Sequence, residues 1–396
     1  MQTVDQRIEK LRKLMEEKGI DIYYIPNEDD HLSEEYTADY FKCKSFISGF
    51  SGEAGCTIVT KDFAGLWTDG RYFTQAEHEL EGTCVTLMRL RQEGVVDPIP
   101  FLIDNTPENG CLGFDGKVVS SSDAIHLSKE LEKKNAKLHT TDDLVDTVWG
   151  KDRPSMPQEE IYILPKKYVG EDITERIQKV RDAMKEKGAD VLVLTKLEDP
   201  CWMLNIRGND IESTPVSYAF AVVTEDEVVY YVDKAKVTDE VEKYFIEAKV
   251  TLKGYNDIEK DLEDLKDKKI WVNLRSFNTS FYSHLDSSNQ IINEDSPVVL
   301  FRAIKNETEL TNTINAHIKD GVAMVRFLYW LKHNIQTVPM TERSAEDKLL
   351  SFREEQEGFI EPSFHTISAY KGNAAMMHYT ANDETNAELH PEGFLL

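Results

Sequence analysis

The feature that most constrains this sequence is an internal repeat. Residues 7–22 read RIEKLRKLMEEKGIDI and residues 176–191 read RIQKVRDAMKEKGADV, and the two segments match in register at Arg, Ile, Lys, Arg, Met, Glu, Lys, Gly and Asp. A repeat at this separation predicts two copies of one domain. A chain of 396 residues has room for two or three domains, since one domain usually takes about 100–200 residues.

Each copy is predicted to contain a helix followed by a buried strand. Apolar residues recur at helical spacing, as Ile8, Leu11 and Met15 in the first copy and Ile177, Val180 and Met184 in the second. Gly19 and Gly188 then stand where a left-handed C-cap ends a helix. The apolar runs 22–25 and 191–194 that follow are typical of strands in a helix-covered sheet.

The two copies also share a pair of later strands. Residues 58–62 and 66–69 match residues 222–226 and 230–233, as two strands joined by a polar turn and ending in an aspartate. Both copies are therefore predicted to be mixed α/β domains.

Two boundaries divide the predicted domains, which span residues 1–150, 160–304 and 306–396. Pro154 and Pro157 end regular structure between the two copies. After the second copy, a long helix is predicted to open the third domain. Its apolar face is formed by Leu310, Ile314, Ile318, Val322, Val325 and Leu328. If that domain lacks its partner sheet, we expect this segment to be poorly packed or paired with another chain.

Charge and cysteine content exclude several classes of function. Lys and Arg number 46 against 72 Asp and Glu, a net charge of −26, so that nucleic acid and anionic membrane surfaces are not expected as partners. No apolar run reaches the roughly 18 residues of a membrane span. The five cysteines are scattered and predict reduced thiols, and the N-terminus shows no secretion signal, so a cytoplasmic location is expected.

Several motifs together resemble the Xaa-Pro aminopeptidase (aminopeptidase P) family. They occur in the family's order over nearly the whole chain, which makes the resemblance far more specific than any single motif. The motifs are WTDGRYF at 67–73, WMLNIRGND at 202–210, KNETE at 305–309 with AHIKDGV at 316–322, and FHTIS at 364–368 with MHY at 377–379.

The resemblance implies an α/β (α+β) fold with two tandem creatinase-type N-terminal domains and the incomplete start of a pita-bread metallopeptidase domain. It also implies removal of the N-terminal residue from peptides with proline in second position. In the family two metal ions, usually Mn²⁺, are held by two aspartates, a histidine and two glutamates that all follow the MHY motif. The sequence ends at Leu396, where the strand with the first aspartate would begin. We therefore expect no metal ligands, no cofactor and no activity in this chain alone.

The same resemblance implies roles for two residues. His378 matches a histidine that borders the substrate pocket and donates a hydrogen bond to the substrate, so it is the candidate catalytic and substrate-binding residue. Arg71 is the second candidate for substrate binding. With Tyr72 it is expected to face the active site of a neighbouring subunit in a homodimer. His365, on a presumed strand, is interpreted as structural.

Other interpretations of the sequence remain open. The glycines at 49–55 form neither a G-x-G-x-x-G nor a Walker motif, and no H-E-x-x-H or G-x-S-x-G is present. A non-catalytic protein that uses the same fold for dimerisation or peptide binding is the main alternative. Prolidase or creatinase activity ranks lower, because those relatives generally have one N-terminal domain and the repeat predicts two.

Overall fold

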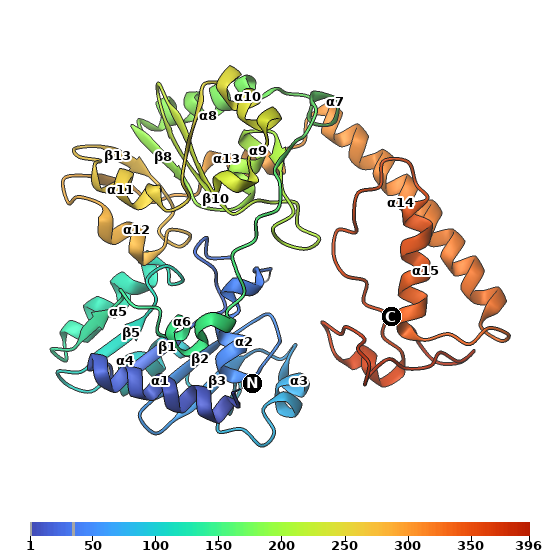
Figure 1. The fold of residues 1–396 in the computed structure, drawn as a ribbon, viewed down its shortest axis with the longest axis horizontal. Coiled ribbons are helices and arrows are strands. Elements are labelled where there is room, and N and C mark those ends of the chain that lie inside the picture. The colour runs from blue at the N-terminus through green and yellow to red at the C-terminus, as the bar shows by residue number, and fades with distance from the viewer. Residues whose placement is uncertain (1, 34–35) are drawn as a thin grey trace. The chain divides into compact units, whose positions relative to one another are not determined.

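The computed structural model describes residues 2–33 and 36–396 and forms two compact units (Figure 1). The first unit comprises Met1–Leu164, Glu171–Ile211 and Pro215–Ile304, and the second comprises Pro165–Gly170, Glu212–Thr214 and Lys305–Leu396. Among the described residues, no helix combines the length and the apolar character needed to cross a lipid bilayer.

The first unit contains two six-stranded sheets with the same topology. The first sheet has the order β4-β3-β2-β1-β5-β6 and the second has the order β12-β11-β10-β8-β13-β14. In both sheets the central strand, β1 or β8, pairs antiparallel with a hairpin on one side and parallel with a later strand on the other. The repeat in the sequence therefore corresponds to two copies of one α/β domain, as predicted.

The first copy places helices on both faces of its sheet. Helices α1, α2, α3 and α6 cover one face, and α4 and α5 cover the other. Successive residues of β1 alternate between the two cores, since Ile22 packs on the α5 side and Tyr23 on the α1 side. The strands are β1 (Ile22–Ile25), β2 (Cys56–Thr60), β3 (Ala64–Thr68), β4 (Thr86–Arg89), β5 (Cys111–Phe114) and β6 (Lys137–His139). The helices are α1 (Val4–Lys18), α2 (Cys43–Ser48), α3 (Phe73–Glu79), α4 (Pro98–Asn105), α5 (Ser121–Glu132) and α6 (Leu144–Trp149).

The second copy follows the same plan. Helices α8, α9, α10 and α13 pack on one face of its sheet, and α11 and α12 pack on the other. The strands are β8 (Val191–Leu194), β10 (Ala219–Thr224), β11 (Val228–Val232), β12 (Val250–Lys253), β13 (Lys269–Trp271) and β14 (Gln290–Ile292). The helices are α8 (Ile173–Lys187), α9 (Glu198–Met203), α10 (Asp239–Glu247), α11 (Asp257–Glu263), α12 (Thr279–His284) and α13 (Pro297–Ala303). A short ribbon of β7 (Tyr162–Ile163) and β9 (Ile206–Arg207) completes the unit.

The predicted helix ends are confirmed in both copies. Gly19 ends α1 with φ 67° and Gly188 ends α8 with φ 70°, the left-handed conformation that glycine adopts without steric cost. Both helices also begin with a capping box, centred on Thr3 and on Asp172. The same local signals therefore set the length of the equivalent helix in each copy.

Buried polar contacts join the two copies within the first unit. The Oγ of Ser121 donates a hydrogen bond to the carbonyl oxygen of Phe277 at 2.6 Å, and Nδ2 of Asn278 donates to the carbonyl oxygen of Asp30 at 2.8 Å. The ring of His31 stacks on Phe220 with 3.9 Å between centroids. The interface between the copies is thus both hydrogen-bonded and aromatic.

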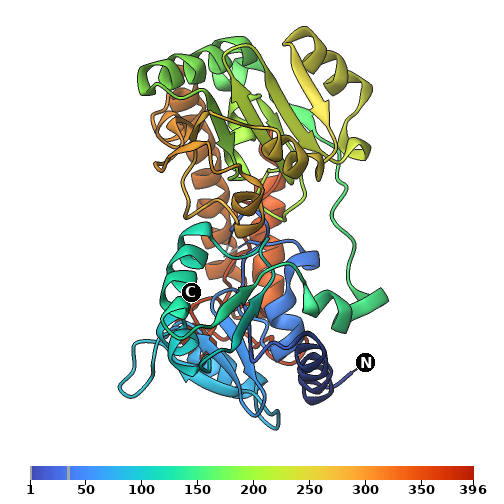
Figure 2. The same cartoon turned by 90° about the vertical axis from the view of Figure 1, so that its left-hand side faces the viewer.

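The second unit is built on two long helices. Helices α14 (Glu307–Asn334) and α15 (Glu342–Glu354) lie side by side (Figures 1 and 2), and α7 (Lys166–Val169) contacts α14. The core between α14 and α15 includes Ala323, Phe327, Ala345, Leu349 and Phe352.

The predicted apolar face of the long helix is present on α14, but its side chains are exposed to solvent. Its six residues are each between 45% and 67% exposed, namely Leu310, Ile314, Ile318, Val322, Val325 and Leu328. The helix instead buries Ala323 and Phe327, which lie on its other side. A large exposed apolar surface of this kind favours association with a partner.

Candidate functional site

Arg71 lies in the turn that connects β3 to α3 in the first unit. The carboxylate of Asp69 accepts hydrogen bonds from the Arg71 main-chain N–H at 2.9 Å and from its Nη2 at 2.8 Å. These hydrogen bonds lower the pKa of Asp69 below its ordinary value, so that the carboxylate stays charged at neutral pH. The Arg71 side chain remains 41% exposed and is held in one orientation at the surface.

Tyr72 does not share the surface position of Arg71. Its side chain is 1% exposed and meets the ring of Phe50 edge-on, with 5.9 Å between centroids. The expectation that Tyr72 faces a neighbouring subunit is therefore wrong. The residue that follows Arg71 turns inward because it begins the apolar face of α3, on which Ala76 and Leu80 are also buried.

His378 belongs to the second unit. His378 lies in a turn that follows the 3₁₀ helix η4 (Lys371–Ala375), and its side chain is partly buried. Its neighbour Tyr379 is buried, and the Tyr379 hydroxyl donates a hydrogen bond to Oε2 of Glu342 at 2.6 Å. Asn373, on the other side of His378, directs Nδ2 at the same carboxylate, 3.1 Å from Oε1.

Glu342 is the charged centre of this part of the second unit. It opens α15 and is 0% exposed, and its carboxylate also accepts the main-chain N–H groups of Tyr370 at 2.6 Å and Ala387 at 2.9 Å. Burial by itself raises the pKa of Glu342, but the hydrogen bonds from its four donors outweigh burial and lower the pKa below its ordinary value. The buried side chain is therefore a carboxylate at neutral pH.

The motif around His365 differs from the expected strand. Residues 364–368 have no regular secondary structure, and the His365 side chain is 59% exposed. Its Nε2 lies 3.2 Å from Oε2 of Glu212. The prediction of a strand here is wrong, since the segment has no neighbouring strand to pair with among the described residues of its unit.

The motif at 202–210 serves the structure of the second copy. The carbonyl oxygen of Trp202 accepts a hydrogen bond from the buried Arg176 at 2.8 Å, and Asp210 forms a buried ion pair with Lys236. Arg207 donates to the carbonyl oxygens of Cys201 and Ile206, so it is a local structural cation.

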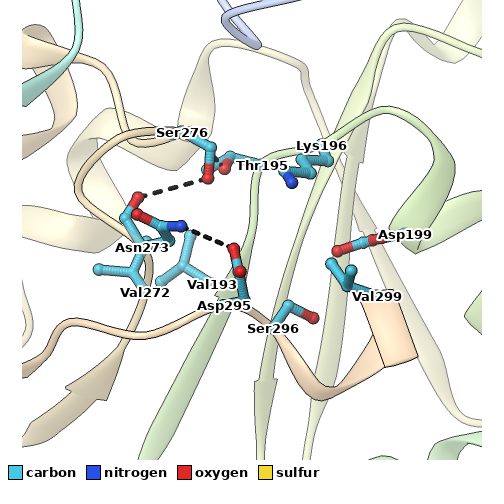
Figure 3. A pocket seen from close by; sticks show the side chains of 10 residues that line it. All are labelled: Val193, Thr195, Lys196, Asp199, Val272, Asn273, Ser276, Asp295, Ser296 and Val299. Carbon is cyan, nitrogen blue, oxygen red and sulfur yellow. Dashed lines mark hydrogen bonds between the residues drawn. The ribbon is translucent and has the colours of Figure 1, made fainter. Parts of the chain in front are cut away.

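A small polar crevice lies at the carboxyl ends of β8 and β13, a place that the sequence motifs do not indicate (Figure 3). In it Thr195 Oγ1 donates to the carbonyl oxygen of Ser276 at 2.6 Å, and Asn273 Nδ2 donates to Oδ1 of Asp295 at 2.6 Å. Polar residues directly after two buried strands are the signal that could have predicted it. These polar groups of the crevice therefore form hydrogen bonds with one another.

Asp199 is a buried carboxyl group that lines this crevice together with Lys196 and Asp295. Burial raises its pKa to about 6, and the nearby Arg302, whose Nε lies 3.0 Å from Oδ1, opposes that rise. Asp199 is therefore the anionic half of an ion pair within the second copy.

A dinuclear metal site needs several carboxylate and imidazole ligands that lie close together. Within residues 2–33 and 36–396, no group of three or more His, Cys, Asp or Glu side chains is placed to hold a metal ion. None of the cysteines in the described part of the chain forms a disulfide bond. The donor groups among the described residues therefore do not form a dinuclear metal site.

Three family matches cover most of the sequence. Residues 7–148 and residues 152–309 each match the Creatinase/Prolidase N-terminal domain, and residues 312–396 match Metallopeptidase family M24. The two creatinase-type matches fall on the two copies of the repeat.

Two named relatives extend the similarity over nearly the whole chain. The probable Xaa-Pro aminopeptidase P of Laccaria bicolor is 39% identical over 386 residues, which cover 94% of this chain and 59% of the relative. Aminopeptidase P1 of Arabidopsis thaliana is 36% identical over 440 residues, with 98% and 67% covered. This chain thus spans about three fifths to two thirds of the length of these relatives.

A solved structure shares the fold. The X-prolyl aminopeptidase of Caenorhabditis elegans, described as a cytosolic enzyme with a di-nuclear active site, superimposes with a TM-score of 0.92 at 28% sequence identity. The match covers 98% of this chain and 66% of the Caenorhabditis elegans chain.

Proposed function

This chain belongs to the Xaa-Pro aminopeptidase family, and from that premise we propose that it contributes to an enzyme that removes the N-terminal residue from peptides with proline in second position. The observation that carries the proposal is the similarity to named Xaa-Pro aminopeptidases over 94% and 98% of the chain. The two creatinase-type copies followed by the M24 match support it, since they are the parts expected of this family.

The metal requirement is the second part of the proposal. We propose that the active enzyme uses two divalent metal ions, with Mn²⁺ as the first candidate, in keeping with the di-nuclear site of the Caenorhabditis elegans relative. Such ions would lower the pKa of a bound water and polarise the scissile carbonyl. The described residues of this chain do not gather the carboxylates needed, so no step through the metals is assigned to them.

His378 is the residue of this chain to which we assign a role in the reaction. An imidazole N–H placed beside the substrate can donate a hydrogen bond to a carbonyl oxygen that gains negative charge in the transition state. The partly buried position of His378 beside the buried Tyr379 supports this assignment, because a fixed donor needs no reorientation during the reaction.

The 396-residue chain assayed alone should not turn over an Xaa-Pro peptide, even with added Mn²⁺. The physical reason is that its described residues offer no group of ligands that could hold the catalytic ions. The amount of N-terminal residue released from the peptide, measured by chromatography, checks this prediction.

Two controls complete this assay. The Laccaria bicolor relative at full length should release the residue from the Xaa-Pro peptide and not from a matched Xaa-Ala peptide. Robust turnover by the 396-residue chain would refute the absence of a working metal site. A form extended to the length of the relatives that binds the peptide and never cleaves it would favour the non-catalytic alternative.

Arg71→Ala should lower kcat/KM about tenfold in a form extended to the length of the relatives, which corresponds to about 1.4 kcal/mol. We propose that the protein is a homodimer and that the exposed Arg71, oriented by Asp69, helps to close the active site of the other subunit. Kinetics with an Xaa-Pro peptide and light scattering measure the two effects. Arg275→Ala, which removes an exposed arginine from the second copy, should leave both unchanged.

If Arg71→Ala changed neither kcat/KM nor the oligomeric state, Arg71 would be an ordinary surface residue. We further propose a cytoplasmic location, which is supported by the description of the Caenorhabditis elegans relative as cytosolic and by described cysteines that form no disulfide bond.

A further inference from the structure

We propose that Glu342 is the positioning residue for His378, holding the chain on both sides of this histidine through one buried carboxylate. The role of His378 in the reaction rests on the proposed function. The fixing of its position by Glu342 rests on the geometry of the second unit alone. Glu342 would act through Tyr379 and Asn373 and would not touch the substrate itself.

The first argument is that the Glu342 carboxylate collects donors from segments distant in the sequence. It stands at the first turn of α15, and it accepts hydrogen bonds from the main chain at Tyr370 and Ala387 and from the side chains of Asn373 and Tyr379. A carboxylate offers about four lone-pair sites, and these donors fill them. One side chain therefore ties residues 370–387 to the helix.

The second argument is the place of His378 within that segment. Consecutive Cα atoms lie about 3.8 Å apart, so a fixed Tyr379 ring confines the main chain of His378 directly. Tyr379 is 4% exposed, its hydroxyl accepts from Asn373 Nδ2 at 3.0 Å, and that amide nitrogen also lies 3.0 Å from the carbonyl oxygen of Thr385. His378 thus lies on a loop that Asn373 and Tyr379 attach to Glu342, and these two residues also bind each other.

The third argument is that the anchor must be a carboxylate. All four partners of Glu342 are donors, and hydrogen bonds to a charged acceptor are shorter and roughly twice as strong as neutral ones. A glutamine of the same size would present an NH₂ group to two of these donors and would lose half of the acceptors. The chemistry of the surrounding groups therefore selects glutamate at this position.

The experiment uses the 396-residue chain and the ring signal of His378 in histidine-labelled protein, assigned by loss of the signal in His378→Asn. In Glu342→Gln this signal should shift by more than its linewidth. Peptides that cover residues 368–389 should exchange their amide hydrogens at least tenfold faster. Tyr379→Phe, which removes one hydroxyl and keeps the ring, should produce a smaller shift of the same signal, and Glu342→Asp should shift it less than Glu342→Gln.

Glu354→Gln is the matched control, since Glu354 lies exposed on the same helix and should leave the His378 signal and the exchange rates unchanged. A purely structural role would lower Tm without moving the His378 signal at 15 °C, and that result in Glu342→Gln and Tyr379→Phe would overturn the proposal. If Glu342→Gln does not fold, Tyr379→Phe alone decides the question. Because no substrate is used, failure of the peptidase proposal would leave this result standing.

Discussion

Lys236→Met should lower the free energy of unfolding of the first unit by about 3–5 kcal/mol. Lys236 is 2% exposed, and its Nζ lies 2.5 Å from Oδ2 of Asp210, whose side chain is fully buried. Without the ammonium, the hydrogen bond left to this oxygen among the described residues is the one that the main-chain N–H of Tyr218 donates at 2.6 Å. An uncompensated buried charge is the physical cause of the loss.

Urea denaturation followed by tryptophan fluorescence would measure this loss, since Trp67, Trp149, Trp202 and Trp271 all lie in the first unit. The double variant Asp210→Asn with Lys236→Met should recover most of the stability, because it removes both charges. Lys234→Met is the matched control, as Lys234 is exposed in the same 3₁₀ turn. A loss below about 1 kcal/mol in Lys236→Met would show that the ion pair is not coupled to folding.

Asp30→Asn should flatten the pH dependence of stability of the first unit. Burial raises the pKa of Asp29 to about 7, and burial together with the charge of Asp29 raises the pKa of Asp30 to about 7. The hydroxyls of Tyr218 and Tyr255, from the second copy, donate to Asp29 at 2.9 Å and to Asp30 at 2.7 Å. The two aspartates therefore titrate inside the interface between the copies.

The sign of the effect follows from proton linkage. Each aspartate has a folded pKa above its unfolded value of 3.8, so its contribution to stability is fully present below about pH 4 and is lost as the pH rises through 7. His31 acts in the opposite direction: burial lowers its pKa from 6.5 to about 3, so its contribution is present above 6.5 and is lost as the pH falls toward 3. Two aspartates outweigh one histidine between pH 4 and 6.5.

The measurable quantity is the stability of Asp30→Asn minus that of the wild type. This difference should grow in favour of the variant by about 4 kcal/mol between pH 4 and 8, because a pKa raised from 3.8 to about 7 costs about 1.4 kcal/mol for each pH unit between these values and the variant has no carboxyl to deprotonate at this position. Asp152→Asn, at an exposed position, should follow the wild-type profile. Parallel profiles for Asp30→Asn and the wild type would contradict the raised pKa of Asp30 and the role assigned to burial.

Local sequence patterns were enough to predict the plan of the first unit. The match of residues 7–22 to residues 176–191 predicted two domains of one kind, and the sheets share one strand order. Gly19 and Gly188 predicted the ends of two helices, and both glycines adopt positive φ. These features follow from signals within a few residues, where periodicity and glycine conformation act locally. The motifs also led to the family, while the roles of Arg71 and His378 stay predictions.

The contacts between polar side chains, in contrast, became known from the three-dimensional fold. Glu342 stands in sequence as one acidic residue at the start of a helix, yet its partners lie at residues 370–387. Asp30 and Tyr255 come from different copies of the repeat, and so do His31 and Thr195. No local pattern encodes such pairs, because the distance between them is set by how helices pack on sheets and not by spacing along the chain. The exposure of His365 and the burial of Tyr72 were settled in the same way, by the neighbours that packing supplies.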